Sequence, residues 1–296
     1  MKKSVLFSLS ALVLISIFGC HSSGPDNHLV VVLMGDPQID MTKNSPSYVK
    51  IAMDDLATIE YDFIAVLGDL LQGDAAYYQD YQDMILNRSS KPVFSLAGNG
   101  DLNVGLDAYK KATGLPLYYT IYRQGIRFIF TSVTAVSGKE KHICHLGAEQ
   151  LAWLVDELKT DTVSTTVILS HPPIFETTYG SEDGEQTGKA RSMYLYESAQ
   201  LRNLFNSYPN VNVFAHGHRH HKYGLVDNYG RGNYCRQGDV LHISVGATAN
   251  NQGSSILYIK NNLIKVKVRD HENHSWLDLY EYNYRVKTTY ANKRIQ

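Results

Sequence analysis

The sequence has no excess of charge of either sign. Among its 296 residues, 28 Lys and Arg oppose 29 Asp and Glu, which gives a formal net charge of -1. No run of like charges indicates an interaction tail or a basic stripe, so we expect no nucleic-acid partner. No Pro-rich or Ser-rich stretch divides the chain, and 44% of its residues are hydrophobic. This composition predicts one large folded domain over residues 28–296.

Cysteine is scarce, with three residues in the whole chain. Cys144 and Cys235 lie in neither a CxxC nor a Cys/His spacing, so we exclude them as zinc ligands. The sequence leaves open whether these two form a disulfide, because that bond requires α-carbons within about 7 Å of each other.

Long hydrophobic runs are also missing, except at the N-terminus. Residues 5–18 are apolar and follow Lys2 and Lys3. This run is too short to span a bilayer comfortably and is typical of a signal peptide. It ends in Phe18-Gly19-Cys20, which resembles the signal of bacterial lipoproteins. The alternative is a plain secretory signal with an incidental cysteine.

The lipoprotein resemblance implies three things about the mature chain. The signal peptide 1–19 would be removed, and Cys20 would carry the acyl chains that hold the protein on a membrane. Residues 20–27 would form a polar tether. Residue 21 is His rather than Asp, so the usual inner-membrane retention signal is not seen. We therefore expect an exported, lipid-anchored protein of the bacterial cell envelope, at the outer membrane or in the periplasm.

What the sequence does contain is an alternation of apolar, strand-like runs with amphipathic segments, which predicts an α/β fold. Five of the runs stop just before a polar residue that can bind a metal ion. In open α/β sheets ligands bind beyond the carboxyl ends of the strands, so these five ends could converge on one site. The runs are 29–34 before Asp36, 62–67 before Asp69, 92–97 before Asn99, 163–169 before His171, and 211–215 before His218.

Other segments complete the predicted organisation. We expect helices over 47–59, 77–86 and 147–159, and a hairpin of 118–122 with 126–133. Strands over 240–245, 255–260, 263–269 and part of 276–284 follow one another without helices, which predicts an antiparallel region. The Gly-rich and acidic segment 180–188 is predicted to be a loop, and it could form a lip facing the substrate.

The polar residues at the strand ends are of the types that bind borderline-hard ions. Carboxylate, amide and imidazole groups suit Mn, Fe or Zn. No thiolate joins them, which argues against an iron–sulfur cluster or a structural zinc site. Two such ions about 3.5–4 Å apart can hold a phosphate and activate water.

The order of these residues resembles the calcineurin-like metallophosphoesterase family. Its five blocks are D-x-H, G-D, G-N-H-D/E, H and G-H-x-H. This sequence has five counterparts in the same order, namely Asp36-Pro37-Gln38, Gly68-Asp69, Gly98-Asn99-Gly100-Asp101, His171, and Gly217-His218-Arg219-His220. The resemblance implies a four-layer α/β/β/α sandwich with mixed sheets. It also implies hydrolysis of a small phosphorylated substrate, a phosphate ester, by two divalent metal ions and a bridging hydroxide.

The resemblance also assigns roles to single residues. Asp36 and His220 would bind the first ion, and Asp69 would bridge both ions. The second ion would be bound by Asn99, His171 and His218, of which Asn99 and His171 are also expected to serve catalysis.

Two positions depart from the family pattern. Gln38 replaces a His, and its amide oxygen is either a weaker seventh ligand or a bystander. Gly100 replaces the His that helps to protonate the leaving group, a contribution of typically about 10²–10⁴-fold. The chain is therefore a slower enzyme, an enzyme with another acid such as His142 or His145, or a non-catalytic module that binds metal and phosphate.

Overall fold

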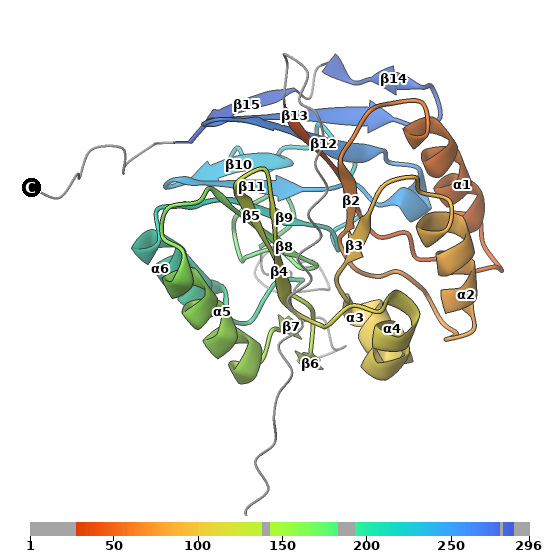
Figure 1. Cartoon of the computed structure of the whole chain (residues 1–296), viewed down its shortest axis with the longest axis horizontal. Coiled ribbons are helices and arrows are strands. Elements are labelled where there is room, and N and C mark those ends of the chain that lie inside the picture. Colours follow the sequence, from red (N-terminus) through yellow and green to blue (C-terminus); the bar gives the residue numbers. More distant parts are fainter. Residues whose placement is uncertain (1–27, 138–142, 183–192, 279–280, 287–296) are drawn as a thin grey trace, which may run out of the picture.

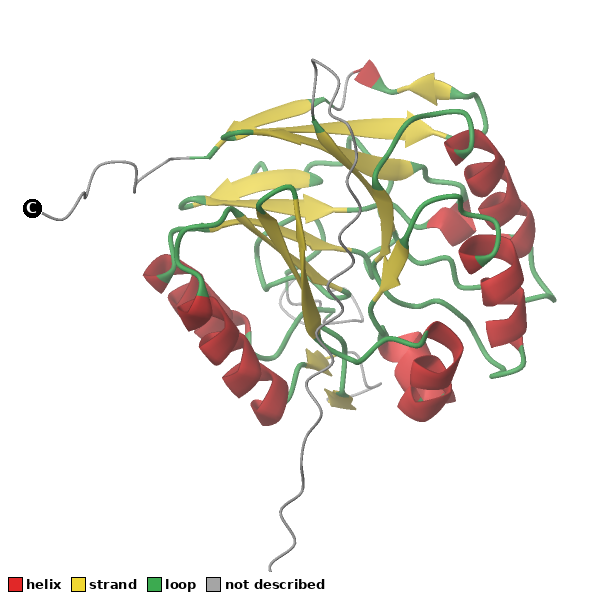
Figure 2. Cartoon of the chain, viewed as in Figure 1, coloured by secondary structure: helices red, strands yellow, loops and turns green. Residues whose placement is uncertain are grey.

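The computed structural model describes residues 28–137, 143–182, 193–278 and 281–286. Two β-sheets pack face to face and helices cover the two outer faces, as Figures 1 and 2 show. This is the expected four-layer α/β/β/α arrangement.

The first sheet has seven strands, and β1, β2 and β3 run parallel at one side of it. Its other side is antiparallel, because β12 pairs with β1 and also forms a hairpin with β13. The strands are β1 (Leu29–Met34), β2 (Phe63–Val66), β3 (Val93–Ser95), β12 (Ser254–Lys260), β13 (Leu263–Asp270), β14 (Ser275–Trp276) and β15 (Tyr282–Arg285).

The second sheet has six strands in the order β10-β11-β9-β8-β5-β4, and its four central strands are parallel. These strands are β4 (Tyr119–Arg123), β5 (Ile126–Phe130), β8 (Thr166–Ser170), β9 (Val211–His216), β10 (Tyr234–Gln237) and β11 (Val240–Ser244). A separate two-stranded sheet pairs β6 (Ala135–Ser137) with β7 (Ile143–His145).

The helices divide between the two outer faces (Figure 2). Beside the first sheet lie α1 (Ser45–Leu56), α2 (Tyr77–Tyr81) with the π-helical turn η1 (Gln82–Leu86), α3 (Asn99–Val104) and α4 (Leu106–Thr113). Over the second sheet lie α5 (Ala148–Thr160) and α6 (Ser198–Ser207), and the 3-10 turn η3 (Thr248–Asn250) follows β11.

Burial on both faces explains why the strands read as continuous apolar runs. In β1, Val31 and Leu33 belong to the core between the two sheets, whereas Val32 and Met34 face the core under the helices. A strand covered on both sides needs apolar residues at every position rather than at alternate ones. A third apolar cluster lies between the second sheet and helices α5 and α6.

Most predicted elements are present within a few residues of their predicted bounds, including the β4–β5 hairpin. Helices α3, α4 and α6 and strands β6, β7 and β10 were not predicted. The expectation of one antiparallel C-terminal region is wrong in part, because β11 runs parallel to β9 in the second sheet. The β12–β13 hairpin lies in the first sheet, and no local pattern reveals which distant strand each segment joins.

Cys144 and Cys235 form no disulfide. The N-terminal residues 1–27 and the predicted lip from 183 to 188 lie outside the described residues. Within the described ranges, every helix is too short or too polar to cross a bilayer.

Candidate metal centre

The predicted ligands follow the carboxyl ends of five parallel strands, and the two sheets bring these ends together. Asp36, Asp69 and Asn99 follow β1, β2 and β3 of the first sheet. His171 and His218 follow β8 and β9 of the second sheet, where a hydrogen bond from the Gly217 N–H to the His171 carbonyl joins their loops (3.0 Å).

Two groups of side chains share one carboxylate. Asp69, His171 and His218 form the first group, and Asp36, Asp69 and His220 form the second; in each, the ligand atoms lie within 4.8 Å of one another. Asp69 belongs to both, which is the arrangement required of a carboxylate that bridges two ions.

His171 is held in an orientation that turns one ring nitrogen toward the centre. Its Nδ1–H donates to the carbonyl oxygen of Leu67 at 2.8 Å. This bond fixes the tautomer and leaves Nε2 as the basic nitrogen. That Nε2 lies 2.9 Å from His218 Nδ1, 3.2 Å from Asn99 Oδ1 and 3.3 Å from Asp69 Oδ1. Four potential ligand atoms therefore meet around one point.

Asp36 organises the other half of the centre. Its carboxylate accepts the His218 backbone N–H at 2.8 Å and lies 3.0 Å from Nε2 of His220. It is completely buried, so one residue ties the loop after β1 to the loop after β9.

The backbone at this centre is strained. Asp36, Gln38, Asp69, His218 and His220 all have positive φ, between 41° and 67°. For a residue other than glycine, this conformation costs on the order of 1–3 kcal/mol. Five of the ten such residues described belong to the predicted ligand set, so the strain is concentrated where the side chains must converge.

Glycines in the blocks make close approach between the loops possible. A Cβ on Gly98 would lie 2.2 Å from Asp69 Oδ1, and a Cβ on Gly217 would lie 2.4 Å from Asp36 Oδ2. Each of these glycines precedes one ligand and touches another, so the Gly-Asn and Gly-His pairs of the sequence have a steric cause.

Burial and mutual charge shift the pKa values of these groups. Burial opposes the ionisation of Asp69, but the neighbouring His171 charge holds the pKa of this carboxyl below its usual value. Burial likewise opposes the protonation of His171, yet Asp69 and Asp36 raise its pKa to about 9. Burial together with the His171 charge depresses the pKa of His218. The acidic groups thus draw positive charge into a buried pocket.

These observations fit a pair of divalent ions. Nδ1 of His218 faces the other ligand atoms, and the lowered pKa of this side chain favours the neutral imidazole, which is the form that binds metal. The carboxylate, amide and imidazole donors match the preferences of Mn, Fe and Zn.

The Gln38 side chain lies in the centre. Its Nε2 donates to Asp69 Oδ2 at 3.1 Å, and its backbone N–H bonds to the Asp69 carbonyl at 2.9 Å. Gln38 therefore contacts the shared carboxylate, and its amide oxygen is the group that could ligate an ion.

Gly100 lies at the start of α3, against the shared carboxylate. Its N–H donates to Asp69 Oδ1 at 2.6 Å, and a Cβ here would lie 2.9 Å from the Leu71 carbonyl oxygen. Of the two substitute acids considered, His142 lies outside the described residues. His145 contacts Ser137, Tyr196 and Glu197, none of which belongs to the centre.

Two supporting features lie outside the predicted ligand set. Asp101 accepts hydrogen bonds from Gly98 N–H, Leu70 N–H and Tyr78 O–H, and so joins the loops after β2 and β3. Burial and the nearby Asp69 raise the pKa of Asp101 to about 7. The second feature is the loop after β11.

That loop supports the ligands from the far side. The Gln252 side chain donates to the His220 carbonyl at 2.9 Å, and Ala249 N–H donates to the Asp36 carbonyl at 3.1 Å. The parallel strand β11 ending at this edge was the available signal, but its direction was predicted wrongly.

Comparison with known proteins adds independent findings. The family model for calcineurin-like phosphoesterases matches residues 29–222. No curated protein matches the sequence. Among solved structures, a dimetal phosphatase from Danio rerio is 14% identical, with a TM-score of 0.62; the alignment covers 88% of this chain and 100% of that one.

Two further structures share the fold at similar distance. Purple acid phosphatase PPD1 from yellow lupin (Lupinus luteus) seeds is 15% identical with a TM-score of 0.63, over 88% of this chain and 54% of that one. GAP50, described as the anchor in the inner membrane complex of Plasmodium, is 14% identical with a TM-score of 0.62, over 88% of this chain and 90% of that one.

Proposed function

Because this chain belongs to the calcineurin-like phosphoesterase family, we propose that it hydrolyses a small phosphate ester at the centre built around Asp69. The observation that carries the proposal is the sharing of this one buried carboxylate by two groups of potential ligands. The dimetal phosphatase and the purple acid phosphatase of the same fold support it.

The residues would act as follows. Asp36, Gln38 and His220 would hold the first ion, and Asn99, His171 and His218 would hold the second, with Asp69 between them. When bound, the two ions would supply the positive charge that binds the phosphoryl oxygens and the acidity that makes a nucleophile of water.

Several groups of the chain keep this arrangement rigid. The Leu67 carbonyl orients His171, and the backbone N–H groups of His218 and Gly100 orient the carboxylates of Asp36 and Asp69. These contacts orient the ligands before a metal ion binds, as the partners behind metal ligands do.

Hydrolysis adds one water molecule across the P–O bond of the ester. The water oxygen bonds to phosphorus, the bond to the ester oxygen breaks, and that oxygen leaves with a proton. Gly100 has no side chain to give this proton, so we propose that water supplies it and that esters with poor leaving groups turn over slowly.

The direct test compares the wild-type protein with Asp69→Asn, using added Mn and the aryl esters p-nitrophenyl phosphate and bis(p-nitrophenyl) phosphate. We expect the wild type to cleave at least one ester and the variant to lose at least about 10³-fold of kcat/KM, because the shared ligand is gone. Asp156→Asn, on the exposed side of α5, is the matched control. Metal bound without any cleavage by the wild type would overturn the enzyme function.

That outcome would instead support a second candidate, a non-catalytic module that holds metal and phosphate. The observation in its favour is Gly100, where the family's acid is absent. GAP50, described as the anchor in the inner membrane complex of Plasmodium, also carries this fold.

We further propose that the protein acts at the bacterial cell envelope, held there by acyl chains on Cys20. The apolar segment that ends in Phe18-Gly19-Cys20 supports this. In a bacterial host, we expect the wild type in the membrane fraction and Cys20→Ser in the soluble periplasmic fraction. Recovery of both proteins in the same fraction would contradict lipid anchoring.

A further inference from the structure

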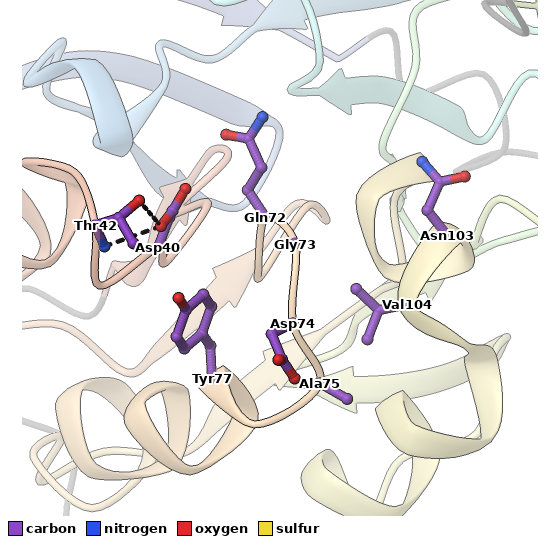
Figure 3. Close-up of a pocket in the computed structure, with 9 residues that line it drawn as sticks. All are labelled: Asp40, Thr42, Gln72, Gly73, Asp74, Ala75, Tyr77, Asn103 and Val104. Carbon is purple, nitrogen blue, oxygen red and sulfur yellow. Dashed lines mark hydrogen bonds between the residues drawn. The ribbon is translucent and has the colours of Figure 1, made fainter.

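A cavity of about 530 Å³ opens between loops that also carry metal-centre residues. Figure 3 shows Asp40 and Thr42 on one side of it, Asn103 and Val104 on the other, and the segment from Gln72 to Tyr77 between them. This size is within the usual range for small-molecule sites, about 300–1,000 Å³.

The cavity walls are formed by chain segments that follow three residues of the metal centre. Asp40 lies two residues after Gln38 in the loop after β1, and Gln72 lies three residues after Asp69 in the loop after β2. Asn103 and Asn99 are four residues apart on α3, a spacing that places two side chains on the same helix face.

Backbone hydrogen bonds keep two of these walls side by side. Ile39 N–H donates to the Leu70 carbonyl at 3.0 Å, and Gln72 N–H donates to the Ile39 carbonyl at 3.2 Å. The segments that follow Gln38 and Asp69 therefore run together into the lining of the cavity.

The lining is polar and acidic. Asp40 and Asp74 supply carboxylates, Gln72 and Asn103 supply amides, and Tyr77 supplies a phenol. Among the described residues that line the cavity, none is Arg, Lys or His. Lys43 lies at the edge, where its Nζ is 3.2 Å from both Asp40 Oδ2 and Gln72 Oε1. One cation thus faces two carboxylates, and the net charge of the cavity is negative.

Acceptor-rich walls with a net negative charge bind hydroxyl or ammonium donors and repel a second phosphate. We propose that this cavity holds the leaving alcohol of the substrate, and that this alcohol carries hydroxyl or ammonium groups and no further anionic group. The inference rests on the proposed phosphoesterase function. Sugar phosphates and amino-alcohol phosphates share this chemistry, whereas bisphosphates and nucleoside polyphosphates do not.

The test measures kcat/KM, with added Mn, for glucose 6-phosphate, phosphoethanolamine and fructose 1,6-bisphosphate. At least one of the first two should exceed the bisphosphate by about tenfold or more, which corresponds to roughly 1.4 kcal/mol. Asp74→Asn removes one carboxylate charge but keeps an oxygen to accept the Ala76 N–H. In this variant the ratio of kcat/KM for the preferred monophosphate to kcat/KM for the bisphosphate should fall at least about threefold, because one repulsive charge is lost.

The experiment distinguishes a sugar from an amino alcohol as the leaving group, and it tests the role of the cavity separately from the phosphoesterase function. A larger loss for phosphoethanolamine than for glucose 6-phosphate in Asp74→Asn would identify the cationic alcohol, and the reverse would identify the sugar. Asp156→Asn, an exposed carboxylate on α5, should leave the preference unchanged. The inference would be overturned if kcat/KM for the bisphosphate equalled or exceeded both other values, or if Asp74→Asn left the three values unchanged. Cleavage of p-nitrophenyl phosphate would still uphold the phosphoesterase function in that case. Failure to cleave any ester would overturn both the phosphoesterase function and the inference about the cavity.

Discussion

At the scale of single residues, the centre combines strained ligands with glycines that have no room for a side chain. The positive φ angles of Asp36 and Asp69 and the missing Cβ atoms of Gly98 and Gly217 have the same cause. Loops from two sheets must bring several side chains to one point, so both backbone conformation and steric bulk are constrained there.

We predict that Gly98→Ala weakens metal binding by about 10–100-fold, the range found when groups that support metal ligands are altered. The added Cβ would lie 2.2 Å from Asp69 Oδ1, so the shared carboxylate must move. Calorimetric titration with Mn measures the affinity. Gly232→Ala is the control, because its Cβ would meet its nearest neighbour at an ordinary 3.4 Å. Equal affinity of both variants would refute the steric argument.

Gly100 requires a comparison of two variants. Both Gly100→Ala and Gly100→His place a Cβ 2.9 Å from the Leu71 carbonyl oxygen, so their difference isolates the imidazole from the steric change. We expect the His variant to exceed the Ala variant by at least about tenfold on an alkyl phosphate, since general acid catalysis contributes roughly 10²–10⁴-fold. On p-nitrophenyl phosphate, whose phenolate leaves without a proton, the two should be similar. Equal rates on both esters would show that no acid acts from this position.

At the scale of elements, a buried ion pair joins helix α1 to strand β13. The Asp55 carboxylate accepts two hydrogen bonds from the Arg269 guanidinium at 2.6 and 2.8 Å and lies 2.8 Å from His271 Nδ1. Residues 214 positions apart in sequence are thereby linked, and the helix layer is attached to the antiparallel side of the first sheet.

We predict that Asp55→Asn lowers the free energy of unfolding by about 3–5 kcal/mol, because it leaves Arg269 without its counter-charge in a buried place. The neighbouring Asp54→Asn removes only exposed ion pairs and should cost less than about 1 kcal/mol. Urea unfolding followed by circular dichroism measures both. Similar losses in the two variants would contradict the importance of the buried pair.

The pair of Asp55 and Arg269 also makes the free energy of unfolding depend on pH. Burial opposes the ionisation of Asp55, but the Arg269 and His271 hydrogen bonds hold its pKa well below its ordinary value. A group with a lowered pKa stabilises the fold above its unfolded pKa of about 3.9 and loses that contribution as pH falls further. The difference in unfolding free energy between the wild type and Asp55→Asn should therefore be constant at neutral pH and shrink below about pH 4. A constant difference down to pH 2.5 would refute this assignment.

At the scale of the whole molecule, the centre lies where the two sheets meet, so bound ions should stabilise both halves. Binding to the folded state adds about 2.7 kcal/mol per site at a metal concentration 100 times Kd. For a domain of this size, each kcal/mol raises the Tm by about 2–4 °C. We therefore expect a chelator to lower the Tm by at least about 5 °C, as measured by calorimetry.

Asp69→Asn should remove most of this response to the chelator, because both ions depend on that carboxylate. Asp156→Asn should retain the full response. A chelator effect of equal size in the wild type and Asp69→Asn would show that the stabilising ion binds elsewhere.

The sequence by itself determined the strand ends at which the predicted ligands lie, and its resemblance to a known family implied the layer type of the fold. Continuous apolar runs indicate strands covered on both faces, and polar residues just after those runs mark the ligand edge of the sheets. These are local patterns within about ten residues, so no tertiary contact is needed to recognise them. Gln38 and Gly100 could be recognised as departures because the family's short blocks have His at both positions.

Only the tertiary structure decided which strands become neighbours and what surrounds the ligands. The parallel pairing of β11 with β9 brings Gln252 to His220 and Ala249 to Asp36, over separations that no local pattern encodes. The close approach of Gly98 to Asp69 and the cavity lined by Asn103 also depend on tertiary contacts. Pairing of distant strands depends on how the entire core packs, whereas strand character and ligand chemistry are properties of short segments.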